Sequence, residues 1–185
     1  NKLIKKGVSK EEIALEAIPL NNRCVEKYIN ASEDGWRERY YDVLFDCDTS
    51  DERIREICIN YAEGLEWTLN YYSGSCIDWE WCYKYHYPPL LSDLLNYLPY
   101  FDCELLTKKP KSPLPSLVQL GYVLPGQCLS ILPSKVHRVL IENHPEWYVS
   151  DAKLEWAFCR YLWEAHAQLP QIDIGELRRL IETVM

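Results

Sequence analysis

Several features that would assign a protein to a class at once are absent from this sequence. No run of about 18 apolar residues occurs, so the sequence predicts no transmembrane helix. No Cys-x-x-Cys pair is present, and eight cysteines among 185 residues fall below the roughly 8–10% of disulfide scaffolds. No signal peptide is visible either. We therefore expect reduced cysteines and an intracellular protein, cytoplasmic rather than nuclear.

Basic residues are also scarce. Lys and Arg number 20 against 28 Asp and Glu, which gives a formal net charge of −8 at pH 7. A free-standing nucleic-acid-binding protein normally carries a basic excess, so this charge argues against that class. A local basic patch is still compatible with it, and Lys108, Lys109 and Lys111 form the one basic cluster of the sequence. Two interpretations of this cluster stay open, a solvated loop and a loop that contacts phosphates.

The short motifs of common catalytic sites are missing as well. G-x-S-x-G, the Walker loop and H-E-x-x-H do not occur. Asp46-x-Asp48-x-Ser50 begins like a calcium loop, but Asp51 stands at the glycine position and Ile57 at the glutamate position of that motif. We therefore interpret this stretch as the acidic start of a helix.

Cysteine and histidine do not form a recognisable metal motif. Cys76, Cys82 and His86 are neighbours in the sequence, but zinc ligands usually come in tight pairs, and the gap between these cysteines is too long for a knuckle. With 8 Cys and 4 His in the chain, a Cys–His nucleophile pair would arise easily by chance. We expect no metal site and no cofactor in this chain.

Apolar residues recur at helical spacing over most of the chain. The longest predicted helix spans 50–72, and its inward positions are Ile54, Ile57, Cys58, Tyr61, Leu65, Thr68, Leu69 and Tyr72. Ser9 and Glu12 form a capping box that starts a first helix over 9–17. Other helices are predicted over 22–29, 36–45, 90–97, 117–124, 134–141, 151–167 and 174–184. The sequence thus predicts a mainly α fold: a single irregular multi-helix domain over 1–185, with a long aromatic loop, few or no strands, and the loop 107–116 between two sub-regions.

Aromatic residues are abundant and concentrated in one stretch. The chain has 14 Tyr, 7 Trp and 3 Phe. Five rings occupy alternate positions, namely Trp79, Trp81, Tyr83, Tyr85 and Tyr87. Pro88-Pro89 excludes a helix through this stretch, and alternation in an extended segment places all five rings on one face. That face is either a half-buried strand packed on the helices, or a platform on which nucleic-acid bases stack at about 1–3 kcal/mol each.

Two stretches carry a resemblance to a known family. They read Tyr61-Ala62-Glu63-Gly64-Leu65-Glu66-Trp67-Thr68-Leu69-Asn70-Tyr71-Tyr72 and Trp79-Glu80-Trp81-Cys82-Tyr83-Lys84-Tyr85-His86-Tyr87-Pro88-Pro89. Together with the pair Ser92-Asp93, they resemble the second conserved region of the XRN family of 5′-3′ exoribonucleases. The segments 36–41, 117–133 and 163–173 resemble further parts of that family in the same order. Departures from the family's pattern at Cys82, Lys84, Pro88 and Gln171 indicate a divergent member.

The resemblance implies that this chain is the helical, C-terminal part of a conserved nuclease core and shapes the path of the RNA. In the family, the metal-binding carboxylates lie in an N-terminal catalytic region that this chain does not include. Mg²⁺ is therefore expected in that region, and no catalytic residue is expected here. The expected partners are single-stranded RNA and the catalytic region of the same protein, with no membrane. The alternative is a non-catalytic module derived from the family, serving as a structural or interaction element in a complex or viral particle.

The resemblance also implies a role for the aromatic stretch. In the family, a tryptophan of this segment packs near the 5′-terminal nucleotide. Trp79 or Trp81 matches that position, and Trp79 is the preferred match. His86 either fixes the loop by a hydrogen bond or contacts the RNA backbone. The RNA-binding candidates are Trp79, Trp81, Tyr83, His86, Tyr87, Lys108 and Lys109. Trp67 and Trp163 fall in helical patterns and are expected in the core.

Overall fold

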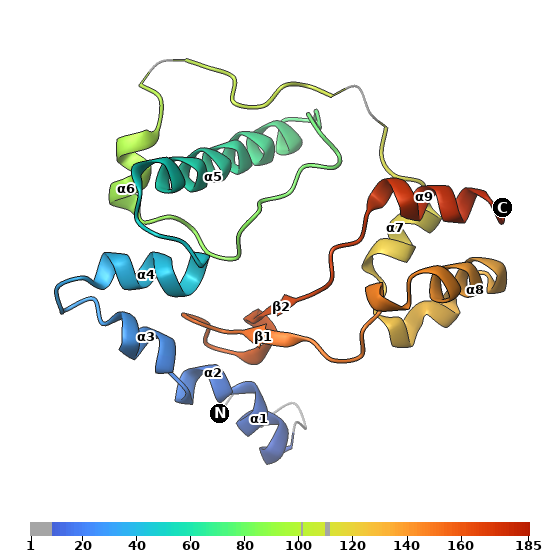
Figure 1. Ribbon diagram of the computed structural model, residues 1–185, viewed down its shortest axis with the longest axis horizontal. Helices are drawn as coiled ribbons and strands as arrows, with labels where there is room; N and C mark the ends of the chain where they lie inside the picture. The colour runs from blue at the N-terminus through green and yellow to red at the C-terminus, as the bar shows by residue number, and fades with distance from the viewer. Residues whose placement is uncertain (1–8, 101, 110–111) are drawn as a thin grey trace. The chain divides into compact units, whose positions relative to one another are not determined.

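The computed structural model describes residues 9–100, 102–109 and 112–185 of the chain. Helices dominate these residues, and the strands among them form one two-stranded sheet, so the predicted mainly α class is confirmed. The chain divides into two compact units between Ser112 and Pro113. One unit is Ile18–Ser112, and the other is Pro113–Met185 together with the described residues up to Ala17 (Figure 1).

The Ile18–Ser112 unit is built around one long helix. Its helices are α2 (Ile18–Asn21), α3 (Cys24–Ile29), α4 (Trp36–Phe45), α5 (Asp51–Tyr72) and α6 (Leu91–Tyr97). Ser50 is the N-cap residue of α5, and Asp51 and Glu52 place negative charge in its first turn, where the helix dipole favours it. The core of this unit consists of Ile29, Tyr40, Tyr41, Ile54, Ile57, Cys58 and Leu94, contributed by α3, α4, α5 and α6.

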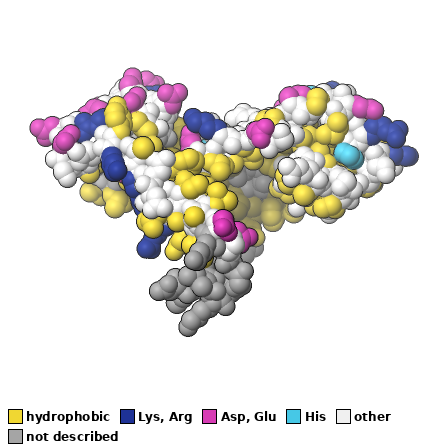
Figure 2. Space-filling view, turned by 90° about the horizontal axis from the view of Figure 1, so that it is seen from below, with side chains coloured by type: hydrophobic (Ala, Val, Ile, Leu, Met, Phe, Trp, Pro, Cys, Tyr) yellow, Lys and Arg dark blue, Asp and Glu magenta, His cyan; other side chains and the backbone are white. Residues whose placement is uncertain are grey.

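The inward face predicted for α5 is correct only in the N-terminal half of the helix. Ile54, Ile57 and Cys58 are buried there. Farther along the same face, Leu65, Leu69 and Tyr72 are 53%, 68% and 82% exposed, and Thr68 is exposed too, so the prediction is wrong for them. The reason is that side chains of α4 and α6 cover the first turns only. Figure 2 shows apolar side chains reaching the surface among charged ones on one face of the molecule.

The Pro113–Met185 unit packs three helices around a second core. These are α7 (Ser116–Val123), α8 (Ser134–Asn143) and α9 (Ile174–Glu182), joined by the 3-10 helices η2 (Gly126–Ile131) and η3 (Pro145–Trp147). The core residues are Val118, Leu129, Leu132, Val136, Leu140, Leu177 and Ile181. At Gly121 a Cβ atom would lie 3.3 Å from Leu177 Cδ1, so glycine lets α7 approach α9 closely. The unit also contains α1 (Lys10–Glu16), which begins with the predicted capping box of Ser9 and Glu12.

The helix predicted over 151–167 is wrong. Strands β1 (Lys153–Glu155) and β2 (His166–Gln168) pair there in an antiparallel hairpin, with Lys153 opposite Gln168 and Glu155 opposite His166. Between them lies the 3-10 helix η4 (Leu162–Glu164). The Glu164 carboxylate accepts hydrogen bonds from the backbone N–H groups of Arg160 and Tyr161, at 2.7 and 3.4 Å. A tight turn replaces the helix because this side chain satisfies backbone donors that a helix would use internally.

Trp163, which was expected in the core, lies in η4 and is 72% exposed, so that expectation is wrong. Its ring stacks on that of Tyr161 at a centroid distance of 5.9 Å.

All eight cysteines lie within the described residues and are free thiols. No helix of the described chain combines the length and the apolar character needed to cross a membrane.

The two halves of α5 should differ in their contribution to stability. We expect Ile54→Ala to lower the free energy of unfolding by about 2–5 kcal/mol, because the side chain is fully buried. Leu69→Ala on the same face should lower it by less than about 0.5 kcal/mol, because that side chain is exposed. Urea unfolding followed by circular dichroism measures both values. Equal losses would show that Leu69 is covered in solution.

Candidate nucleic-acid interface

The aromatic segment, defined as residues 77–87, runs back along α5 in the opposite direction (Figure 1). Three of its rings meet aromatic rings of the helix. Ring centroids are 6.4 Å apart for Trp79 and Tyr71, 6.1 Å for Trp81 and Trp67, and 5.7 Å for Tyr83 and Tyr61.

Polar groups of α5 hold the backbone of the segment. Asn60 is 6% exposed, and its Oδ1 accepts a hydrogen bond from the N–H of Lys84 at 3.0 Å. Trp67 Nε1 donates to the carbonyl oxygen of Asp78 at 2.7 Å. The segment has no strand partner among the described residues, so these side chains supply hydrogen bonds that a sheet would otherwise provide.

Gly64 sits where Trp81 crosses α5. A Cβ atom on Gly64 would lie 2.8 Å from Trp81 Cη2, closer than two carbon atoms can approach. The glycine therefore allows the Trp81 indole to lie directly on the helix backbone and stack on Trp67 with an interplanar angle of 23°. Trp81 is half-buried as a result.

The far end of the segment is fixed by α4. Tyr40 Oη donates to the carbonyl oxygen of Pro88 at 2.8 Å. Tyr41 Oη donates to Asp93 Oδ2 at 2.8 Å and accepts from the N–H of Leu90 at 3.2 Å. Arg37 Nη2 and Nε also donate to the Asp93 carboxylate, at 2.9 and 3.2 Å. Burial and the neighbouring carboxylate raise the pKa of Tyr41 well above its ordinary value, so the phenol keeps its proton at neutral pH.

A second irregular stretch of chain, residues 105–109, forms hydrogen bonds with both α5 and the aromatic segment. Glu66 Oε2 accepts hydrogen bonds from the N–H groups of Leu105 and Leu106, at 2.8 and 3.3 Å. The buried carboxylate of Asp78 meets Lys109 Nζ at 2.6 Å and accepts from the N–H of Glu80 at 3.0 Å. The hydrogen bond and charge of Asp78 raise the pKa of Lys109 above its ordinary value.

The seven residues suggested by the sequence all lie in the Ile18–Ser112 unit, but they differ in accessibility. Trp79 is 41% exposed, while Tyr87 is 5% exposed. Trp81 and Tyr83 are half-buried, and Tyr83 Oη donates to the carbonyl oxygen of Tyr87 at 2.7 Å. His86, Lys108 and Lys109 are exposed, and Lys109 holds Asp78. Lys111 lies outside the described residues.

Sequence reasoning missed the anchoring residues, which are Asn60, Glu66, Asp78, Tyr41 and Arg37. For Asn60 and Glu66, the sequence signal is that polar residues recur on α5 at 60, 63 and 66, along a face that the apolar pattern assigns to solvent. No group of three or more His, Cys, Asp or Glu side chains in the described chain could hold a metal ion. No chemical step is therefore assigned to the described residues.

Replacing Gly64 should displace Trp81. We expect Gly64→Ala to lower the free energy of unfolding by about 1–3 kcal/mol, because the new methyl group overlaps the indole. Urea unfolding of Gly64→Ala, Trp81→Leu and the double variant measures the coupling between the two positions. In the Trp81→Leu background the loss should become smaller. An unchanged loss would mean that the indole does not lie on Gly64.

Lys109 and Lys108 should behave differently although they are adjacent. Lys109→Ala removes the partner of Asp78, so the N–H of Lys109, which donates to the carbonyl oxygen of Ile77 at 3.0 Å, should exchange with solvent faster than in the parent. Lys108→Ala is the matched control and should leave exchange unchanged. Because the folded pKa of Lys109 is raised, the protection is complete below the ordinary lysine pKa and is lost as pH rises through the folded value. Hydrogen–deuterium exchange near neutral pH compares the two variants, and equal exchange in both would contradict the ion pair. An NMR titration of the Lys109 ammonium group checks the direction of the pKa shift.

Comparison of the sequence with known proteins identifies the family of this chain. The model of the Xrn1 helical domain matches residues 6–185. The 5′-3′ exoribonuclease 2 of Gallus gallus is 33% identical over 163 residues, covering 86% of this chain and 17% of that protein. The proteins of the same name from Neurospora crassa and Arabidopsis thaliana are 33% and 34% identical over 155 residues each, covering 82% and 80% of this chain. The chain spans only 14% of the length of each of these two. Since the family model extends over nearly all of the sequence, the chain belongs to the Xrn1 helical domain family.

Proposed function

We propose that this chain contacts single-stranded RNA as the helical part of a 5′-3′ exoribonuclease, and that Trp79 stacks on the 5′-terminal nucleotide. The proposal rests on membership of the Xrn1 helical domain family, on relatives named 5′-3′ exoribonuclease 2, and on the anchored aromatic segment. The family match continues through both compact units, which supports the further proposal that they act as one helical domain.

The observation that carries the proposal is the position of Trp79. The indole is 41% exposed, and its neighbours are fixed on both sides: Asp78 binds Lys109, and Trp81 lies on Gly64. The rings of Trp79 and Tyr71 stand nearly perpendicular, at an interplanar angle of 87°. A ring held in this way offers an immobilised face to a base, and stacking of this kind tolerates any sequence because every base has a π-face.

The remaining candidates divide into two groups. Trp81, Tyr83 and Tyr87 are packed, so we assign them to the shape of the RNA path rather than to free stacking surfaces. His86, Lys108 and Lys109 are exposed and provide hydrogen-bond donors for phosphate oxygens. Lys109 remains 56% exposed while it binds Asp78, so the same ammonium can also face the RNA backbone.

Phosphodiester hydrolysis is assigned to a region outside this chain. The described residues offer no metal cluster, and the chain covers 14% to 17% of the relatives named above. We infer that an N-terminal catalytic region of the same protein supplies Mg²⁺ and the water-activating carboxylates, as the resemblance implies. The eight free thiols favour a reducing compartment, which supports an intracellular location.

Degradation of RNA with a 5′-monophosphate by the full-length protein, with Mg²⁺, tests the role of Trp79. Loss of a stacking contact of about 1–3 kcal/mol should lower the rate at limiting RNA by about 5- to 150-fold in Trp79→Ala. Tyr100→Ala is the matched control, because this ring is 88% exposed in the same compact unit. Unchanged rates in both Trp79→Ala and Trp81→Ala would overturn the proposal that the aromatic segment stacks on RNA bases.

Two further observations separate an enzyme part from a non-catalytic module. The isolated 185-residue chain should bind the RNA without hydrolysing it, and hydrolysis at the rate of the full-length protein would contradict the assignment of catalysis elsewhere. The gene sequence upstream of Asn1 should encode a cluster of acidic metal ligands. A gene without that cluster would support the structural or interaction module instead.

A further inference from the structure

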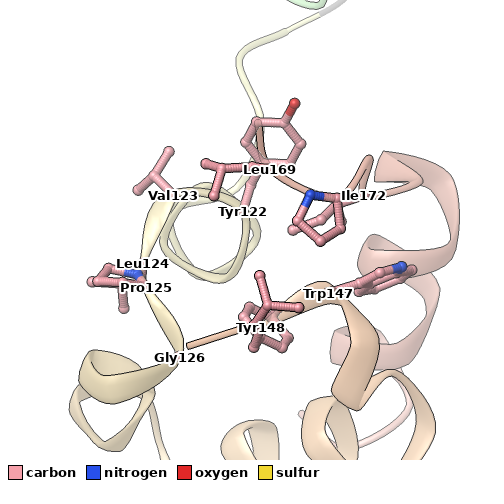
Figure 3. A pocket seen from close by; sticks show the side chains of 11 residues that line it. Tyr122, Val123, Leu124, Pro125, Gly126, Trp147, Tyr148, Leu169 and Ile172 are labelled. Carbon is pink, nitrogen blue, oxygen red and sulfur yellow. The ribbon is translucent and has the colours of Figure 1, made fainter. Parts of the chain in front are cut away.

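A small apolar pocket opens in the Pro113–Met185 unit, apart from the aromatic segment in sequence. It has a volume of about 210 Å³ and is formed where the end of α7, the 3-10 helix η3 and the stretch 169–172 meet. Figure 3 shows side chains from these three places arranged around an open centre, with Tyr148 between Trp147 and Leu124. Its lining contains no Asp, Glu, Lys, Arg or His side chain.

The walls of the pocket are pre-formed. Trp147 stacks on His144 at a centroid distance of 3.8 Å with the rings nearly parallel, and Tyr148 Oη donates to the carbonyl oxygen of Gly121 at 2.8 Å. At Gly126 a Cβ atom would lie 2.8 Å from the carbonyl oxygen of Tyr148, so the backbone of η2 approaches η3 as closely as glycine allows. A ligand would therefore bind without first ordering these side chains.

The side chains that line the pocket are apolar or aromatic, and Tyr148 Oη is already engaged by the carbonyl oxygen of Gly121. Within two sequence positions of the lining residues, the charged residues are all acidic, namely Glu146, Asp151 and Asp173. No Lys or Arg occurs within that distance in the sequence. All three carboxylates are exposed. Glu146 also pairs with His144 Nδ1 at 2.7 Å, and Asp173 Oδ1 accepts from the N–H of Glu176 at 2.7 Å.

We propose that this pocket binds a basic, proline-rich protein segment in the polyproline II conformation. Walls of aromatic and proline side chains suit such a segment, because polyproline II segments dock in aromatic-lined grooves and are already extended before they bind. The acidic surroundings complement Lys or Arg residues that flank the prolines.

Other classes of ligand fit less well. Pockets for small molecules usually measure about 300–1,000 Å³ and add several polar groups, whereas this one is smaller and is lined by apolar and aromatic groups. A nucleic acid would bring phosphates toward Glu146, Asp151 and Asp173, where like charges repel them. A proline ring and its neighbour, inserted from an extended chain, match both the size and the charge.

Binding of a synthetic fluorescent peptide to the 185-residue chain tests the proposal. The peptide contains two Pro-x-x-Pro repeats with arginine at both ends, and fluorescence anisotropy measures its affinity. Leu169→Ser should weaken binding about tenfold or more, because the exposed Leu169 side chain forms part of the wall. Leu95→Ser is the matched control, since Leu95 is 65% exposed and Leu169 66% exposed, and it should leave the affinity unchanged.

Two further variants test the chemistry without removing a wall. Tyr122→Phe keeps the ring that lines the pocket and removes only a hydroxyl turned away from its centre, so it should leave the affinity nearly unchanged. Replacing both arginines of the peptide by glutamates should abolish measurable binding if the acidic surroundings matter. The proposal is overturned if the basic peptide does not bind the parent chain, if Leu169→Ser and Leu95→Ser bind it equally, or if oligouridylate displaces it.

Discussion

The hydrogen-bond requirement of an irregular backbone laid against a helix determines the organisation of the Ile18–Ser112 unit. A helix surface presents no backbone donors or acceptors, so a segment packed on it must find partners among side chains. Asn60, Trp67 and Glu66 supply them from α5, each to a backbone group of residues 78–106. A buried amide without a partner would be destabilising by about 1–3 kcal/mol, which explains why polar residues occupy a packed face of this helix.

This requirement also explains how the aromatic rings are held in position along α5. Once the backbone of the segment is fixed at Asp78 and Lys84, the side chains between these points have no freedom to slide along α5. Gly64 then fixes the depth of Trp81, and Trp79 is left at the accessible end of the series. A surface ring is useful for repeated, sequence-independent contacts only if its orientation is settled before a ligand arrives.

Local sequence signals predicted the helices well and the long-range contacts poorly. The bounds of α4 and α5 follow from Gly35 and Ser50, whose effects are confined to one turn. The hairpin at 153–168 could not be predicted, because its strands pair residues up to 15 positions apart, such as Lys153 and Gln168. The roles of Asn60 and Asp93 depend on partners 24 and 52 residues away, and spacing within a helix contains no information about them.

The contacts of Asp93 have a consequence for the order of folding. Arg37 and Tyr41 reach this carboxylate across 56 and 52 residues, and the whole of α5 and the aromatic segment lies between the two ends. Closing a loop of that length is entropically unfavourable until the intervening chain is already compact. We therefore expect the Asp93 contacts between α4 and α6 to form late, after the rings have packed on α5. When these contacts open, the segment is released together with the core, so the aromatic surface should unfold cooperatively with the unit rather than fray from it.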